Sequence, residues 1–192
     1  MISKKEWMPL IGMTIAAFVF NTSEFMPVGL LSGIAQTFSI SISTAGLMIT
    51  IYSWSVLLLS LPLMLIVCNY NYRKILCVTL ACFACGQFLS SIAPNFLCLV
   101  LARFIVACAH AVFWSVASVI ACHLVCPEKK EFAMSMIVTG TSVAMIFGLP
   151  LGRIVGLYVG WRMTLILAGI IAIVLGVISV CRFPRIKQTR SF

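Results

Sequence analysis

The stretch 96–125, FLCLVLARFIVACAHAVFWSVASVIACHLV, decides the fold of this 192-residue chain. Its one side chain with a permanent charge is Arg103, and everything around that arginine is apolar or small. A helix needs about 20 apolar residues to cross a hydrocarbon layer of about 30 Å. The stretch therefore predicts a transmembrane helix.

Five further apolar runs are long enough to cross a bilayer. Hydrophobic residues make up 62% of the chain and charged residues 9%, with a mean hydropathy of +1.17. A soluble protein of this size has too small an interior for that much apolar surface. The runs lack the alternation of barrel strands, so they are expected to be helices. We predict an all-α, polytopic membrane protein of six spans, at 9–31, 44–68, 75–93, 96–125, 132–159 and 163–181.

The basic residues predict the orientation of the chain. Ten of the thirteen lie before the first span, after the second and fourth spans, or after the sixth. Basic residues collect on the cytoplasmic side, so both termini are expected to be cytoplasmic. The same distribution, in short clusters and not in a long stripe, argues against nucleic acid as a partner. We expect a six-helix membrane bundle over 1–184 and a cytoplasmic tail over 185–192.

The nine cysteines give little sign of a metal, cofactor or redox site. Cys82 and Cys85 form a C-x-x-C, and Cys122, His123 and Cys126 form a small cluster. Neither group has a second ligand pair at zinc-finger spacing. No nucleophile and base stand together either, so we expect no metal, no cofactor and no enzyme activity.

Two prolines suggest an internal repeat. Pro62 and Pro150 each lie 18 residues after the start of their predicted spans, 44–68 and 132–159. These spans cross the membrane in opposite directions, as corresponding helices of an inverted 3+3 repeat do.

Glu24 and Arg103 are ionisable residues inside predicted spans, where a charge costs about 2.5–3.5 kcal/mol at the bilayer centre. From their positions in the spans and a rise of about 1.5 Å per residue, both lie in the outer third of the bilayer. They are therefore expected to be close enough to meet. Two interpretations stay open. Either Glu24 exchanges a proton along a polar path, or a structural ion pair or hydrogen bonds of the carboxylate lock the first helix against the fourth.

Three side chains of the span 96–125 share one helical face, because Arg103, His110 and Trp114 are spaced by 7 and 4 residues. Asn21 stands three residues before Glu24 and is expected to face the same space. We interpret these residues as the wall of an aqueous, substrate-binding cavity. The alternative is a packing face with satisfied polar groups.

The fifth span contains Gly148, Pro150, Gly152 and Arg153 within six residues. Glycines let helices approach closely, and proline removes a backbone hydrogen bond and bends a helix. The motif predicts either close packing or a kinked helix on which one bundle rocks against another.

Three motifs resemble a known family. The segment 20–31, FNTSEFMPVGLL, is similar to the first helix of bacterial sugar-efflux transporters. The segments 109–115, AHAVFWS, and 148–156, GLPLGRIVG, are similar as well, the latter followed by Gly160, Trp161 and Arg162. Those proteins export arabinose-like sugars and thiogalactosides across the inner membrane. They belong to the drug/proton-antiporter branch of the major facilitator superfamily.

The resemblance implies roles for individual residues. The glycine- and proline-containing motif resembles the antiporter signature, Arg103 resembles a fourth-helix arginine implicated in proton coupling, and Glu24 resembles a first-helix membrane acid. Two positions depart from the family pattern and bear on gating and coupling. The loop 69–74, NYNYRK, keeps the usual basic pair but lacks the usual Asp and Gly, and Val106-Ala107 replaces a Gln-Gly.

Family members have about twelve helices, so the resemblance implies that this chain corresponds to the amino-terminal six-helix half. We expect either a truncated product or a half that pairs with a second six-helix half or with a second copy of itself. The expected function is export of sugars in exchange for protons by alternating access. The alternatives are a multidrug efflux component, and a non-transporting remnant or membrane partner protein.

Overall fold

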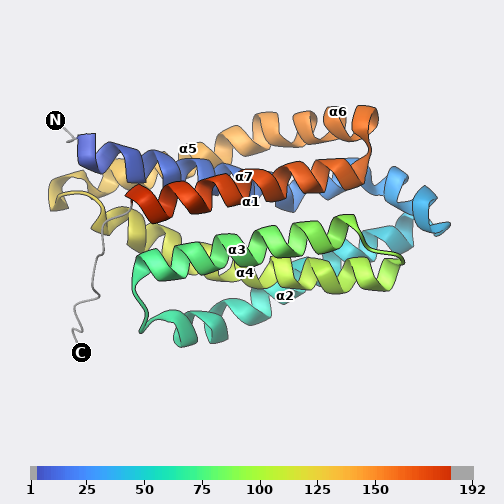
Figure 1. Ribbon diagram of the computed structural model, residues 1–192, viewed down its shortest axis with the longest axis horizontal. Helices are drawn as coiled ribbons and strands as arrows, with labels where there is room; N and C mark the ends of the chain where they lie inside the picture. The colour runs from blue at the N-terminus through green and yellow to red at the C-terminus, as the bar shows by residue number, and fades with distance from the viewer. Residues whose placement is uncertain (1–3, 183–192) are drawn as a thin grey trace.

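The computed structural model describes residues 4–182, and every regular element in that range is a helix (Figure 1). The predicted tail, 185–192, lies outside the described residues. Polar side chains cap several helix starts; the Asn95 side chain, for example, accepts a hydrogen bond from the Cys98 N–H at 2.8 Å. The elements are α1 (Lys4–Phe38), α2 (Ile42–Val67), α3 (Tyr72–Ser91), α4 (Phe96–His123), η1 (Pro127–Lys129), α5 (Lys130–Val143), η2 (Ala144–Gly148), α6 (Leu149–Val159) and α7 (Trp161–Arg182).

Six segments of the described chain are long and apolar enough to cross a membrane. The helices α1, α2, α3, α4 and α7 each provide one of them. The remaining segment, Pro127–Val159, runs through η1, α5, η2 and α6. The all-α architecture with six apolar spans, predicted from hydropathy and length, is therefore confirmed.

The first helix is longer than the sequence predicts. The predicted first span ends at residue 31, but α1 continues to Phe38 and ends before Ser39, which has a φ of 53°. The extension is held by tertiary contacts, because Ile34 is buried and Trp161 Nε1 donates a hydrogen bond to Thr37 Oγ1 at 2.9 Å. Polar composition alone did not reveal this packing.

The bundle has two groups of helices (Figure 1). In the first group, α1 packs against α5, η2, α6 and α7, and in the second α4 packs against both α2 and α3. The two groups are joined mainly through the contact between α3 and α7. The first residues of α1 and the last residues of α7 lie at the same end of the bundle, as an even number of crossings requires.

The fifth span contains a π-helical segment, η2, immediately before the α6 residues Leu149 and Pro150. Proline has no N–H to donate to the preceding turn, and a π segment is a common way for a helix to accommodate a local irregularity. The π segment overlaps the glycine and proline motif only at Gly148, and the kink expected at that motif stays a prediction.

Glycines bring the fifth span close to α1. A Cβ atom on Gly140 would lie 2.5 Å from the Thr14 carbonyl oxygen, and one on Gly152 would lie 2.6 Å from Met26 Cγ. A Cβ on Gly148 would overlap Thr22 Oγ1. These positions form a dry interface in which only glycine permits the observed distance between the helices.

Candidate functional site

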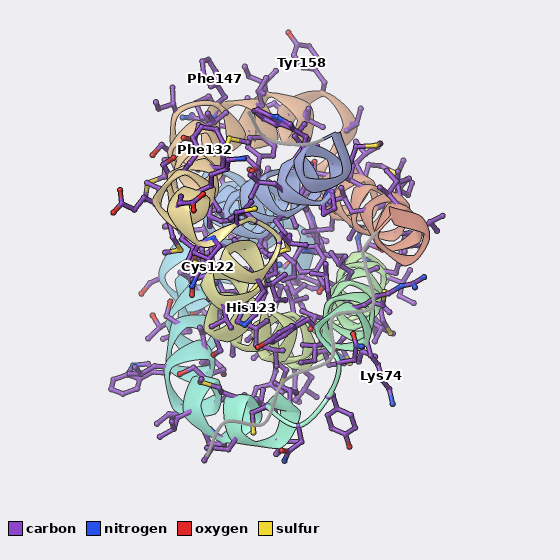
Figure 2. The ribbon with its side chains drawn as sticks, turned by 90° about the vertical axis from the view of Figure 1, so that its left-hand side faces the viewer. Lys74, Cys122, His123, Phe132, Phe147 and Tyr158 are labelled. Atoms are coloured by element: carbon purple, nitrogen blue, oxygen red, sulfur yellow. The ribbon has the colours of Figure 1, made fainter. Side chains whose placement is uncertain are left out.

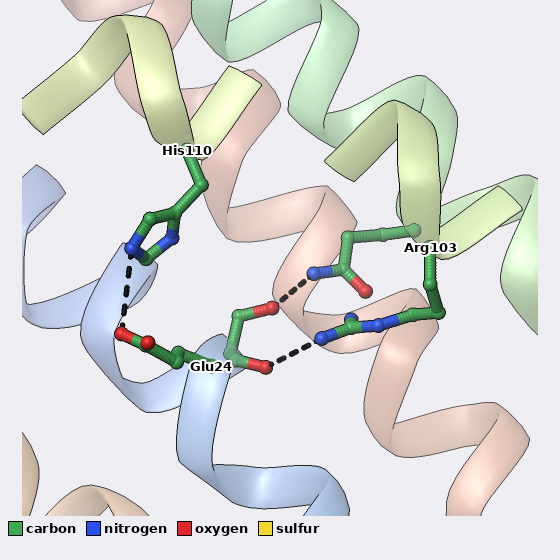
Figure 3. A network of polar contacts seen from close by, with 5 residues as sticks. Glu24, Arg103 and His110 are labelled. Carbon is green, nitrogen blue, oxygen red and sulfur yellow. Dashed lines mark hydrogen bonds and ion pairs between the residues drawn. The ribbon is translucent and has the colours of Figure 1, made fainter. Parts of the chain in front are cut away.

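A cluster of polar side chains lies where α1 faces α4. His110 Nε2 lies 3.3 Å from Glu24 Oε2 (Figure 3). The His110 side chain is only 3% exposed, whereas that of Glu24 is 29% exposed. One member of the pair is therefore enclosed by protein, while the carboxylate also reaches the surface of the bundle.

Arg103 is buried beside this pair, and it contacts the backbone of α1. Its Nη2 donates a hydrogen bond to the Ser23 carbonyl oxygen at 3.0 Å. Its guanidinium lies 4.8 Å from the centre of the Tyr52 ring, within the range of a cation–π interaction. The expected ion pair between Arg103 and Glu24 is absent from the described contacts. The Glu24 carboxylate pairs with His110, and the Arg103 guanidinium donates to the carbonyl oxygen of Ser23.

Ser23 connects three helices. Its carbonyl accepts from Arg103 of α4, and its hydroxyl accepts a hydrogen bond from Gln87 Nε2 of α3 (Figure 3). Gln87 is fully buried. Sequence reasoning missed Ser23, Gln87 and Tyr52, although an isolated glutamine or tyrosine inside an apolar span is a signal that could have identified them.

Aromatic rings surround His110. The ring centres of Phe20, Tyr52 and Trp114 lie 5.8, 5.7 and 6.1 Å from that of His110. Tyr52 contacts both His110 and Arg103, so α2 joins two residues that the sequence placed on one face of the fourth span. The structure thus brings Arg103, His110 and Trp114 into one neighbourhood.

Several buried polar atoms of this region have no hydrogen-bond partner among the described residues. An unpaired buried polar group costs about 1–3 kcal/mol, so a group of them indicates a place that is built to bind something polar. Asn21, which the sequence analysis expected to face the same space as Glu24, belongs to this set. The atoms are Asn21 Oδ1, Thr22 Oγ1, Tyr52 Oη, Gln87 Oε1, Arg103 Nε and Nη1, and His110 Nδ1.

The glycine and proline motif lies next to the cluster and outside it. Gly148 and Gly152 pack against Thr22 and Met26, which flank Ser23 on α1. Arg153 is exposed, and its Cβ would be 3.1 Å from a Cβ on Gly29. The motif therefore holds α1 against the fifth span, while the Ser23 carbonyl and the Glu24 carboxylate contact α4.

Metal chemistry has no support in the described part of the chain. No three His, Cys, Asp or Glu side chains in that part are grouped so that they could hold a metal ion. The cluster can instead hold a proton on the Glu24 carboxylate, donate and accept hydrogen bonds, and present aromatic faces.

The fold and this cluster describe a multi-pass helical membrane protein with a polar site within its bundle. Residues 13–192 match the model of the Major Facilitator Superfamily. The chain belongs to that superfamily, whose members are membrane transporters and not enzymes.

Two solved structures share the fold. One is a bacterial homologue of the human lysosomal transporter Spinster, in an inward-facing and unoccupied conformation, with a TM-score of 0.78 and 18% identity over 99% of this chain. The other is a peptide transporter in complex with sulfate, with a TM-score of 0.77 and 11% identity over 92% of this chain. The matches cover 46% and 37% of those proteins, so this chain spans less than half of their length.

Proposed function

We propose that this chain forms one half of a proton-coupled exporter of sugars or related small polar solutes. The observation that carries the proposal is the contact between Glu24 and His110, which joins a partly exposed acid on α1 to a buried base on α4. A transporter that couples solute movement to protons needs a titratable group reachable from water and linked to a moving helix.

In this proposal, Glu24 carries the proton. The ionised carboxylate accepts a hydrogen bond from His110 Nε2 and so attaches α1 to α4. Protonation removes the negative charge and weakens that attachment, because charge-assisted hydrogen bonds are roughly twice as strong as neutral ones. The proton thereby changes the relative stability of two arrangements of the bundle, which is the requirement for coupling.

The solute is proposed to bind beside the pair. Sugars present many hydroxyl groups and apolar ring faces, and they are commonly held by hydrogen-bonding groups together with aromatic rings. Asn21 Oδ1 and His110 Nδ1 have free hydrogen-bonding capacity among the described residues, and Trp114 offers a partly exposed ring near them. This combination favours a sugar over a purely apolar drug.

The second half of the transporter is proposed to be another six-helix bundle, or else a second copy of this chain. Supporting this, the chain spans less than half of the two structural relatives. Large apolar side chains are exposed on the fifth span, where Phe147 and Tyr158 extend outward (Figure 2). Lipid or a partner bundle must cover such surfaces.

The orientation is also a proposal: both termini on the cytoplasmic side of a bacterial inner membrane. Arg73 and Lys74 lie in the first turn of α3, Lys129 ends η1, and Lys130 begins α5. These two connections lie at the end of the bundle where α1 begins (Figure 1). Reporter fusions to each end of the chain test this, and two ends on opposite sides would contradict the six-span topology.

Transport into inverted membrane vesicles tests the proposed function. The chain is expressed alone and together with a matching second half, and uptake of a labelled thiogalactoside is measured with and without an imposed pH gradient. We expect gradient-driven uptake with the second half present, and we expect Glu24→Gln to abolish it. The matched control is Glu131→Gln, which changes an exposed acid of α5 and is expected to leave uptake unchanged.

Three outcomes would contradict parts of the proposal. Absence of sugar uptake under every gradient, with the second half supplied, would favour the non-transporting alternative. Uptake of apolar drugs in place of sugars would favour a multidrug exporter. Unchanged proton dependence in Glu24→Gln would remove the role assigned to that residue.

A further inference from the structure

A second candidate binding site lies away from the polar cluster. A groove of about 390 Å³ runs between α2, α3 and α4. Its walls are apolar, and they include Leu63 and Val67 of α2, Val78 of α3, and Cys108 and Val112 of α4. A mostly apolar groove of this size accommodates several methylene groups.

The groove opens on the opposite side of α4 from the proposed transport site. Val112 follows Arg103 by nine residues, which at about 100° per residue places it about 180° around the helix. Val78 is 59% exposed at the edge of the groove, as expected for a side chain that faces lipid. The groove is therefore a peripheral feature, and its occupant would not enter the transport path.

Basic and aromatic residues stand at one end of this groove. Lys74 lines the groove and also a shallow polar pocket next to it, which Asn71, Arg73 and Cys77 complete. The Lys74 ammonium lies 5.0 Å from the centre of the exposed Tyr70 ring, and Lys74 reaches outward from the end of the bundle (Figure 2). Tyrosine and lysine are side chains that membrane proteins commonly place at the level of the lipid headgroups.

The charge at this end is not balanced locally. The segment 68–79 contains Arg73 and Lys74 and no acidic residue. Two cations without an acid, at the mouth of an apolar groove, are complementary to a molecule with an anionic head and an apolar tail.

We infer that this groove binds an anionic phospholipid, with its phosphate at Arg73 and Lys74 and an acyl chain along Val78 and Val112. The lipid would fill the space between α2 and α3 and hold these helices together at that end. This inference does not depend on the proposed transport function, because the site lies on the other face of α4.

Native mass spectrometry of the full chain tests the inference, with phosphatidylglycerol and phosphatidylcholine titrated into the detergent-solubilised protein. We expect retention of one phosphatidylglycerol in preference to phosphatidylcholine. The double change Arg73→Gln and Lys74→Gln is expected to lower the phosphatidylglycerol affinity by roughly tenfold or more. The matched control is Lys129→Gln with Lys130→Gln in the neighbouring connection, which is expected to keep the affinity.

A second variant tests the apolar part of the site. Val78→Trp would fill the groove from its exposed edge, and it is expected to lower the affinity for phosphatidylglycerol with both basic residues intact. An unchanged affinity in this variant would overturn the placement of the acyl chain.

Two further results would overturn the inference as a whole. An equal loss of affinity for phosphatidylglycerol in the Arg73/Lys74 and Lys129/Lys130 variants would show that the lipid is attracted to positive charge in general and not to this groove. Competition by inorganic phosphate at millimolar concentration would show an anion site that does not require a lipid.

Discussion

The two faces of α1 contact their neighbours in opposite ways. On one face, Thr22 and Met26 touch glycines of η2 and α6, with no space for another carbon atom. On the other face, Ser23 and Glu24 reach α3 and α4 through hydrogen bonds and an ion pair. Four residues within one stretch of five, 22–26, thus take part in both a close interface and a polar one.

The two interfaces are therefore expected to differ in how easily they change: the glycine interface is rigid, and the polar interface can respond to a proton or a solute. The glycine interface depends on shape, and a packed interface has little tolerance for intermediate positions. The polar interface depends on protonation and on hydrogen bonds that a solute can replace. We expect α1 to move together with α5 and α6 as a unit, and its contact with α4 to change during any transport cycle.

Adding one methyl group to the dry face should have the largest effect on stability. Gly140→Ala places a Cβ 2.5 Å from the Thr14 carbonyl oxygen, a backbone atom that cannot turn away. We expect a loss of about 3 kcal/mol, the upper part of the range for overpacking. Unfolding by sodium dodecyl sulfate in mixed micelles measures it.

Gly46→Ala is the matched control, because a Cβ there meets nothing within 4 Å. It should be neutral or stabilising by up to about 1 kcal/mol through helix propensity. Equal behaviour of the two variants would show that the close approach of α1 and α5 contributes nothing.

A change at Ser23, which connects α1 to α3 and α4, should have the next largest effect on stability. Ser23→Ala removes the acceptor of the buried Gln87 side chain while keeping the carbonyl that Arg103 uses. We expect a loss of about 2 kcal/mol, because an unpaired buried amide keeps its full desolvation cost. The same unfolding measurement applies.

The double variant Ser23→Ala with Gln87→Leu sharpens that result. With both partners apolar, no buried amide remains unpaired, so part of the stability should return. A double variant less stable than Ser23→Ala alone would mean that Gln87 acts through another contact.

Replacement of the Tyr52 ring, which lies against the Arg103 guanidinium, should lower the stability by less. Tyr52→Leu removes the aromatic face 4.8 Å from the guanidinium, with an expected loss of about 1 to 2 kcal/mol. Tyr52→Phe keeps the face and removes a hydroxyl that has no partner among the described residues, so its effect should be within about 0.5 kcal/mol. Equal losses in both variants would indicate that the hydroxyl matters and the ring does not.

The pair at the centre of the proposed site should contribute least to stability. A double-mutant cycle with Glu24→Gln and His110→Gln is expected to give a coupling energy of about 0.5 kcal/mol, because the carboxylate is partly exposed. A coupling of zero would show that the pair does not attach α1 to α4 and would contradict its proposed role in proton coupling.

Sequence reasoning placed several residues of the candidate site on one helical face, but it did not predict which side chains contact one another. Arg103, His110 and Trp114 were placed on one face from their spacing, and they do lie in one neighbourhood. The partner of Glu24 was predicted to be Arg103 from depth in the membrane alone. Depth is one coordinate; the direction in which each side chain points also depends on how the helices are rotated against one another.

What the sequence determined by itself is the number and type of the elements. Hydropathy and length are local properties, and a backbone in lipid must satisfy its own hydrogen bonds, so six apolar runs become six helices in any arrangement. What only the tertiary structure decided is which buried groups meet: Glu24 with His110, Arg103 with Ser23 and Tyr52, and Gly140 with Thr14. Those contacts join residues far apart in the chain, and they exist only once packing has set the rotation and separation of the helices.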